Sequence, residues 1–155
     1  MIAQKKSENG ANSEFLAFRI GEQEFCIDIM SVREIRGWTP ATSLPHAPSF
    51  VRGVINLRGS VLPIVDLADR LGLPQAVATS RHVVIVVQVG QQNIGLLVDA
   101  VSDILMESAA AIQPTPDVAS DIVRSFVRGV LAVDERLINV IALDSLTPAA
   151  LDEVA

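Results

Sequence analysis

The stretch from Phe50 to Leu67 decides the fold of this chain. It reads Phe50-Val51-Arg52-Gly53-Val54-Ile55-Asn56-Leu57-Arg58-Gly59-Ser60-Val61-Leu62-Pro63-Ile64-Val65-Asp66-Leu67. Two runs rich in β-branched residues flank Asn56 to Gly59, a pattern typical of two strands joined by a glycine-containing turn. Pro63 has no N–H to give to a sheet, so its strand is expected to lie on an edge there or to carry a bulge. The stretch therefore predicts a β-hairpin whose turn is exposed.

An internal repeat surrounds this hairpin. At an offset of 69 residues Gly21 aligns with Gly90, and the alternating segments that follow the two glycines align as well. Past the proline-containing loops the offset becomes 76 residues, and 50–54 then matches 126–130 without a mismatch. A duplication explains this economically, and chance similarity between two β-rich halves is the alternative. Each half offers about five strands, enough for a small closed barrel. We therefore expect an all-β fold of two small β-barrels packed together, one over about 14–74 and one over about 80–146.

The remaining segments are expected to supply more strands, short helical turns and two tails. The polar residues 1–13 can bury little surface and are expected to be a disordered tail. Alternating apolar residues predict strands over 15–20, 25–30, 31–36, 82–89 and 94–98. Proline and glycine predict a loop over 37–49, a linker over 75–80, and short helices over 68–73 and 117–124. Residues 147–155 are left as a C-terminal tail.

Composition excludes several classes of protein. Half of the 155 residues are hydrophobic, which is enough for a core, and the net charge of -6 argues against non-specific nucleic-acid binding. The one cysteine, Cys26, cannot form an internal disulfide and fits a reducing compartment. Apolar runs reach about five residues, far short of the roughly 20 that span a membrane. No signal peptide is recognised at Met1 to Ser13, so we expect a cytoplasmic protein without direct membrane insertion.

The polar residue types that serve catalysis form no familiar pattern. Neither His46 nor His82 has a partner at the spacing of a metal site, and no phosphate-binding loop or nucleophile elbow is present. Cys26 alternates within a predicted strand and is interpreted as a small hydrophobe. We therefore predict a protein that is not an enzyme and has no cofactor or metal. The alternative from a different class is a small hydrolase using Cys26 or His46.

Surface recognition remains as the predicted activity. Glu34 and Arg58 are expected to flank one groove, with Val32, Val101 and Ile104 at its floor. Apolar anchors with a charged rim are suited to holding a helix of a partner protein. Two alternatives stay open: the three apolar residues are ordinary core, and the two charged residues form a solvated pair.

The two hairpin turns differ although their strands match. In the repeat, 58–60 (Arg-Gly-Ser) aligns with 134–136 (Asp-Glu-Arg). Positions kept in both halves, such as Gly53 and Gly129, are expected to serve the fold. The first turn is therefore expected to carry something that the second does not need.

Three segments resemble one known family. They are 32–37 (Val-Arg-Glu-Ile-Arg-Gly), the hairpin 50–67 quoted above, and 98–105 (Val-Asp-Ala-Val-Ser-Asp-Ile-Leu). Together with the proline loop they look like CheW, the adaptor family of bacterial chemotaxis. The resemblance runs from about Glu14 to Leu146 and leaves no further domain. It implies two five-stranded SH3-like β-barrels around a shared core, and no catalytic activity.

The resemblance also implies partners and contact residues. CheW-like domains bridge the cytoplasmic tips of methyl-accepting chemotaxis receptors to the regulatory domain of the histidine kinase CheA, in membrane-associated arrays that can include further CheW molecules. The positions that match the receptor-binding groove are Val32, Glu34, Ile35, Gly53, Arg58, Val101 and Ile104. The positions that match the kinase contacts are Leu16 and Ile29 at one barrel end, and Gln113, Asp117 and Val118 at the other. Val118 departs from the family, which often has a larger aromatic residue there. Within the family, the alternative is an adaptor of another receptor–kinase pathway, for motility or gene control.

Overall fold

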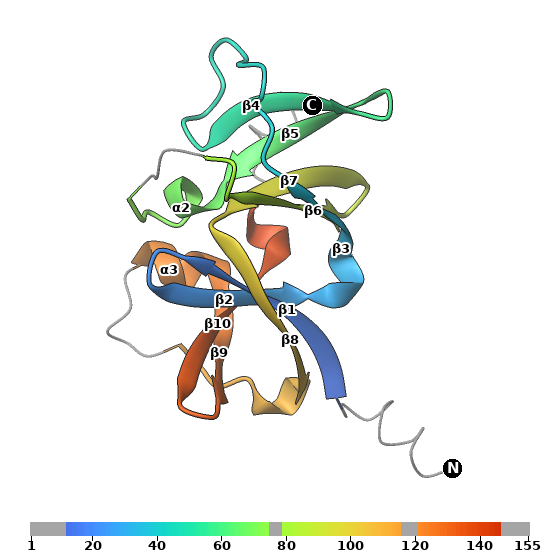
Figure 1. Ribbon diagram of the computed structural model, residues 1–155. Helices are drawn as coiled ribbons and strands as arrows, with labels where there is room; N and C mark the ends of the chain where they lie inside the picture. The colour runs from blue at the N-terminus through green and yellow to red at the C-terminus, as the bar shows by residue number, and fades with distance from the viewer. Residues whose placement is uncertain (1–11, 75–78, 116–120, 147–155) are drawn as a thin grey trace.

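Ten strands in two sheets make up most of the computed structural model (Figure 1), which describes residues 12–74, 79–115 and 121–146. The strands are β1 (Asn12–Ile20), β2 (Gln23–Asp28), β3 (Val32–Gly37), β4 (Val51–Leu57), β5 (Ser60–Asp66), β6 (Val83–Val89), β7 (Gln92–Val98), β8 (Ala100–Ser108), β9 (Val127–Val133) and β10 (Arg136–Ile141). The helical elements are short: η1 (Ile29–Ser31), α2 (Leu67–Arg70), η2 (Ala109–Ala111), α3 (Asp121–Phe126) and η3 (Leu143–Leu146). The predicted all-β class is confirmed.

The bounds of these elements confirm the duplication. At the offset of 76 residues β4 coincides with β9, and α2 coincides with η3. The strand order is β8-β1-β2-β10-β9 in the first sheet and β3-β6-β7-β5-β4 in the second. The strands β1 to β5 of the first half correspond, in order, to β6 to β10 of the second. When each strand in one sheet is replaced by its counterpart, the strand order of the other sheet results. Both sheets therefore have the same plan, with one parallel pair each (β2 with β10, β5 with β7) among antiparallel neighbours.

The two sequence halves exchange strands, which differs from the expectation of one barrel per half. The first sheet takes β1 and β2 from the first half and β8, β9 and β10 from the second, and the other sheet has the reverse composition. In Figure 1 the blue strands of the N-terminal segment accordingly lie beside the orange strands of the C-terminal segment. Period-2 alternation defines the apolar face of a strand but not its neighbour, so the sequence pattern was compatible with either pairing.

Isolated bridges take the place of the continuous ladder that a closed barrel requires. The chain beyond β3 returns to the far edge of its sheet, where Thr42 and Val54 exchange backbone hydrogen bonds of 2.8 and 2.9 Å. Gln113, beyond β8, makes the same pair of bonds with Val130 at the far edge of the other sheet, at 2.9 and 2.8 Å. The sheets are therefore SH3-like but are not closed barrels, which corrects that part of the prediction.

Glycine makes this close approach of the backbone possible. A Cβ atom on Gly53 would collide with the carbonyl oxygen of Thr42, and one on Gly129 would collide with that of Gln113. Gly53 also has φ +141°, a backbone conformation that residues with a side chain rarely adopt. The two glycines are kept in both halves because each lies at the bridge that joins the edges of its sheet.

One apolar cluster joins the two sheets, as expected of a shared core. It includes Phe18 and Phe25 of the first sheet, Ile85 and Leu96 of the second, and Leu146 of η3. Two smaller clusters lie apart from it, one among strands of each sheet. The sheets are thus held together mainly by burial of apolar surface.

Arg70 of α2 adds a specific contact at the junction. Its guanidinium carbon lies 4.4 Å from the ring centroid of Phe50 and 4.5 Å from that of Phe126. These distances are within the range of cation–π attraction. Since the two phenylalanines are counterparts in the repeat, the contact ties matching points of the two halves to each other.

Most local predictions agree with the structure within a few residues. Pairing of β5 with β7 begins at Ile64, so the part of the strand that contains Pro63 is an edge, as expected. The predicted helices 68–73 and 117–124 correspond to α2 and to α3, which is described from Asp121. Ile29 lies in η1 and not in the strand predicted over 25–30, since the Asp28 side chain accepts a hydrogen bond from the N–H of Met30 and caps a turn there.

The predicted tails lie largely outside the described residues. This applies to 1–11 of the predicted tail 1–13, and to all of 147–155. Asn12 and Ser13 belong to β1, where they pair with Ser108 and Glu107, so the folded part begins slightly earlier than expected. Within the described residues, none of the helices has the length and hydropathy needed to cross a bilayer.

Candidate protein-interaction surfaces

Glu34 and Arg58 form an ion pair at the surface, which fits the alternative of a solvated pair that the sequence left open. Arg58 Nη2 donates to Glu34 Oε1, and Arg36 Nη1 lies 3.0 Å from Glu34 Oε2. The hydrogen bond from Arg58, together with that from Arg36, lowers the pKa of Glu34, which is therefore ionised at neutral pH. The side chain of Arg58 is 69% exposed, so part of its guanidinium is available to a partner.

The turn conformation explains why Arg58 projects from the molecule. It has φ 52°, in the left-handed region, and Gly59 follows with φ +88°. The amide of Asn56 stabilises this turn by accepting a hydrogen bond of 2.8 Å from the N–H of Gly59. The sequence Asn-Leu-Arg-Gly thus sets the position of the arginine at the tip of the hairpin.

The apolar residues of the predicted groove separate into two groups. Ile35 on β3 is 48% exposed and Ile104 on β8 is 55% exposed, and these two are counterparts in the repeat. Val32 and Val101 are half-buried and pack against the main core. The alternative that these residues are core therefore fits Val32 and Val101, whereas Ile35 and Ile104 are surface residues.

The predicted receptor-binding residues extend over both sheets. Glu34, Ile35 and Arg58 belong to the second sheet, while Val101 and Ile104 belong to β8 of the first. Gly53 is buried, and its place at the bridge with Thr42 gives it a role in the fold. It can affect binding only through the position of the hairpin that carries Arg58.

The predicted kinase contacts have mixed outcomes. Ile29 is half-buried in η1, and Gln113 is exposed in the bridge at the edge of the first sheet, so both can meet a partner. Leu16 is only 2% exposed, and its side chain faces inward from β1 and packs in the main core, so it offers no side-chain surface to a partner. Asp117 and Val118 lie outside the described residues.

The second hairpin also carries an arginine that reaches an acidic residue. Arg136 Nη2 lies 2.7 Å from Glu24 Oε2, and Arg136 Nη1 lies 3.7 Å from Asp103, the counterpart of Glu34. We expected the first turn to carry something that the second does not need. This is only partly correct, because the second hairpin also has an arginine paired with an acidic side chain. The arginine is displaced by two positions and is mostly committed to Glu24. The alignment of Glu34 with Asp103 was the signal that could have revealed it.

Other exposed apolar residues were not predicted from the sequence. Val61 and Leu137 are counterparts in the repeat, on β5 and β10, and both are largely exposed. Met30 and Met106 are exposed as well. Alternation alone did not identify them, because it does not tell which face of a strand is left uncovered.

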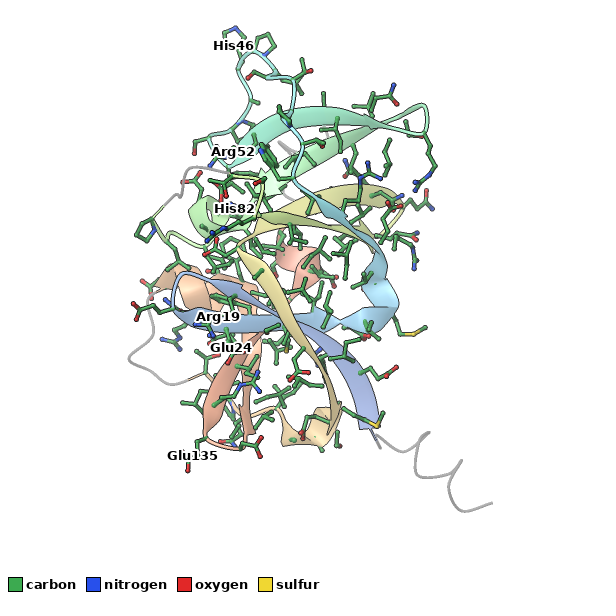
Figure 2. The ribbon with its side chains drawn as sticks, in the orientation of Figure 1. Arg19, Glu24, His46, Arg52, His82 and Glu135 are labelled. Atoms are coloured by element: carbon green, nitrogen blue, oxygen red, sulfur yellow. The ribbon has the colours of Figure 1, made fainter. Side chains whose placement is uncertain are left out.

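The geometry argues against the hydrolase. Cys26 is buried, and burial raises the pKa of its thiol to about 12, so the nucleophilic thiolate is not formed at neutral pH. His46 is exposed in the proline loop with φ 61°, well away from His82 in Figure 2. His82 accepts from the N–H of Thr79 at Nδ1 and faces Asp99 at Nε2, which fastens the start of β6. No metal-binding group of acidic, histidine or cysteine side chains is found in the described ranges.

Comparison with known proteins agrees with this arrangement. The family model for the CheW-like domain matches residues 14–150. The chain is 61% identical over 153 residues to the chemotaxis protein CheW of Rhizobium meliloti, covering 99% of this chain and 98% of that one. It is 59% identical over 150 residues to the probable chemotaxis protein CheW of Rhizobium etli, covering 97% of each. The crystal structure of the scaffolding protein TtCheW from Thermoanaerobacter tengcongensis superposes with a TM-score of 0.80 at 31% identity, covering 90% of each chain. The chain belongs to the CheW family of non-catalytic chemotaxis adaptors.

Proposed function

We propose that this protein couples methyl-accepting chemotaxis receptors to the regulatory domain of the histidine kinase CheA. The observations that carry the receptor side are the exposure of Ile35 and Ile104 and the ion pair of Glu34 with Arg58, which we propose act together as one receptor-binding surface. It combines two exposed apolar side chains with a cation that is mostly solvated, the composition of a site for an amphipathic helix.

The kinase is proposed to bind elsewhere on the molecule. Gln113 bridges β9 of the first sheet, whereas the hairpin that carries Arg58 belongs to the second sheet, so receptor and kinase need not compete there. Each contact can be weak, because binding in an array raises the effective concentration of the partners. The protein would then reside in the cytoplasm and collect at receptor arrays on the membrane.

An Arg58→Ala substitution tests the receptor site. Arg58 is exposed and pairs with a residue that retains Arg36, so the fold should remain intact while receptor binding weakens by about fivefold to tenfold, the usual effect of losing a charge-assisted hydrogen bond at an interface. Binding to a purified receptor cytoplasmic fragment and thermal unfolding are the two measurements.

Arg33→Ala is the matched control for that experiment. Arg33 is an exposed arginine on β3, the strand that carries Glu34, and its guanidinium is bonded to Gln88 of β6. The control should bind the receptor fragment as the unaltered chain does. Loss of cooperative unfolding in the Arg58 variant would show that Arg58 is structural, and undiminished binding by a folded Arg58 variant would contradict the proposed receptor site.

A further inference from the structure

The first half of the repeat contains an internal arginine–carboxylate pair. Arg52 on β4 donates to Asp66 Oδ2 from Nε at 3.0 Å and from Nη2 at 2.8 Å (Arg52 is labelled in Figure 2). Asp66 is only 3% exposed and also caps α2, accepting from the N–H of Asp69. The carboxylate thus fills the space between β4 and the start of the helix.

The second half keeps the cation and lacks the carboxylate. Arg128 on β9 is the counterpart of Arg52 within the matching segments 50–54 and 126–130, while Ala142 is the counterpart of Asp66. The structure supports this equivalence, because Val51 pairs with Val65 in one hairpin and Val127 pairs with Ile141 in the other. Ala142 precedes η3 just as Asp66 precedes α2.

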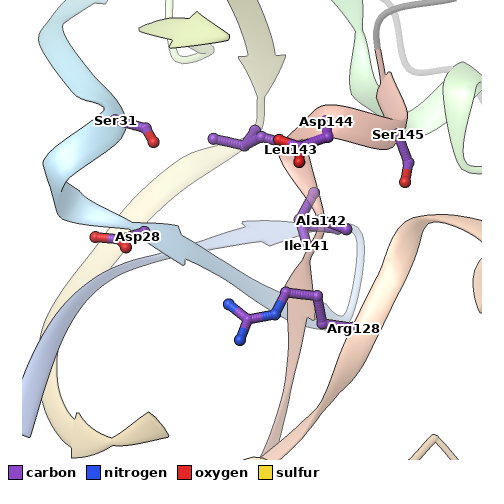
Figure 3. A pocket seen from close by; sticks show the side chains of 8 residues that line it. All are labelled: Asp28, Ser31, Arg128, Ile141, Ala142, Leu143, Asp144 and Ser145. Carbon is purple, nitrogen blue, oxygen red and sulfur yellow. The ribbon is translucent and has the colours of Figure 1, made fainter. Parts of the chain in front are cut away.

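A cavity of about 370 Å³ lies where the missing carboxylate would be. Arg128 and Ala142 line it, together with Asp28 and Ser31 from the end of β2 and η1, and Asp144 from η3 (Figure 3). The guanidinium of Arg128 extends from β9 toward the end of β2 that carries Asp28. The cavity is large enough for a carboxylate-bearing side chain and several water molecules.

Among the described charged groups that line the cavity, the guanidinium of Arg128 is the one without a hydrogen-bond partner. The Asp28 carboxylate already accepts a hydrogen bond from the N–H of Met30. Asp144 also already interacts with another group of the protein. Within the described part of the chain, Arg128 has neither a hydrogen-bond acceptor nor an ion-pair partner, although its guanidinium carries five N–H donors. A second carboxylate bound to Arg128 would restore the arrangement that Arg52 and Asp66 make in the other half.

We propose that a carboxylate side chain of the kinase regulatory domain enters this cavity and binds Arg128. The inference rests on the proposed function, since Ile29, which we assign to the kinase contact, lies between the cavity residues Asp28 and Ser31. Asp28 and Asp144 give the cavity a net negative charge with Arg128 included, which disfavours a free small anion. A docked protein segment overcomes this repulsion, because its own N–H groups can face the two aspartates.

Ala142→Asp is the decisive variant, because it restores the residue found in the other half. The new carboxylate should pair with Arg128 inside the chain, keep or raise the melting temperature, and lower the affinity for the purified CheA regulatory domain by about tenfold or more. Arg128→Gln should lower that affinity to a similar extent without the added charge. Ala132→Asp, an exposed alanine on the same strand, is the control and should leave binding unchanged.

The outcomes separate this inference from the proposed function. If the unaltered chain does not bind the regulatory domain, the proposed coupling function fails and this inference fails with it. If the unaltered chain binds, and folded Ala142→Asp and Arg128→Gln variants bind equally well, the carboxylate site alone is overturned. An equal loss in Ala132→Asp would show a general effect of added charge and would also overturn it.

Discussion

Arginine side chains in this protein differ in how much of the guanidinium is already used within the chain. Arg52 binds the buried Asp66, and Arg136 binds Glu24 through two nitrogens. Arg58 gives one bond to Glu34 and is otherwise exposed. Internal pairs serve the fold, because removing one partner leaves the other buried and unpaired, whereas the exposed arginine is suited to a partner protein.

Glu24 is expected to make stability depend on pH in the acid range. The hydrogen bond from Arg136, opposed in part by burial, lowers the pKa of Glu24 below its ordinary value of 4.5. A carboxylate with a lowered pKa in the folded state stabilises above its unfolded pKa, and this stabilisation is lost as the pH falls through the folded pKa. A Glu24→Gln variant should therefore be less stable at neutral pH and lose less stability on acidification.

Urea unfolding at about pH 7 and about pH 3.5 measures this difference. Glu22→Gln, at the exposed turn between β1 and β2, is the control and should behave like the unaltered chain. An acid sensitivity that is the same in the Glu24 variant would contradict the role assigned to the pair with Arg136.

Cys26 is expected to be inert in the folded protein. It is fully buried and its thiol has a pKa of about 12, so a thiol reagent should react only after unfolding exposes the side chain. Labelling with an aromatic disulfide in buffer and in concentrated urea compares the two states. Rapid labelling of the native protein would contradict this and reopen the question of a reactive cysteine.

At the scale of the elements, the bridges at the sheet edges decide how the sheets curl. Thr42 crosses β4 at Gly53, and Gln113 crosses β9 at Gly129, with no room for a Cβ atom at either glycine. The edge strands β4 and β9 thereby gain a partner on their outer side. This arrangement protects otherwise open edges from pairing with other chains.

A Gly53→Asp substitution should therefore destabilise the fold by about 2 kcal/mol or more, since it adds a backbone collision to an unfavourable φ. Receptor binding should weaken along with it, because the hairpin bearing Arg58 loses its anchor. Gly37→Asp on β3 is the control, since no atom lies within 4 Å of a Cβ added there. Equal urea midpoints for the two variants would refute this account of Gly53.

At the scale of the whole molecule, neither sequence half contains a complete sheet. The β1–β2 hairpin of the first half is flanked by β8 and β10, and the β6–β7 hairpin of the second half is flanked by β3 and β5. The main core cluster draws on both sheets in addition. Folding must therefore bring together strands that are far apart in the sequence.

A fragment comprising residues 12–74 should accordingly fail to fold alone. In the fragment, β1 and β2 would lack their neighbours β8 and β10, and β3 and β5 would lack β6 and β7. Such small isolated groups of strands are only marginally stable in water. Circular dichroism during urea unfolding should show no cooperative transition for the fragment, and a single one for the full chain. A cooperative transition in the isolated fragment would mean that each half can form its own barrel after all.

The sequence by itself determined which segments are strands, which residues turn them, and that the chain is a duplication. These are local properties: β-branched alternation, glycine at positive φ in the turns, and proline at an edge. The Asn-Leu-Arg-Gly turn likewise placed Arg58 at a hairpin tip, and the family motifs identified the adaptor class. Glu34 was expected beside the groove from the mixed charges of its segment, and Ile35 was named only through the family resemblance.

Only the tertiary structure decided which strands pair, and with them which residues are accessible. The exchange of hairpins between halves, the burial of Leu16, the bond from Arg136 to Glu24 and the cavity beside Arg128 all depend on contacts between distant segments. Two halves with nearly the same pattern offer each strand two equivalent neighbours. The choice between them is made by burial of the common core and by the connections, which no local pattern encodes.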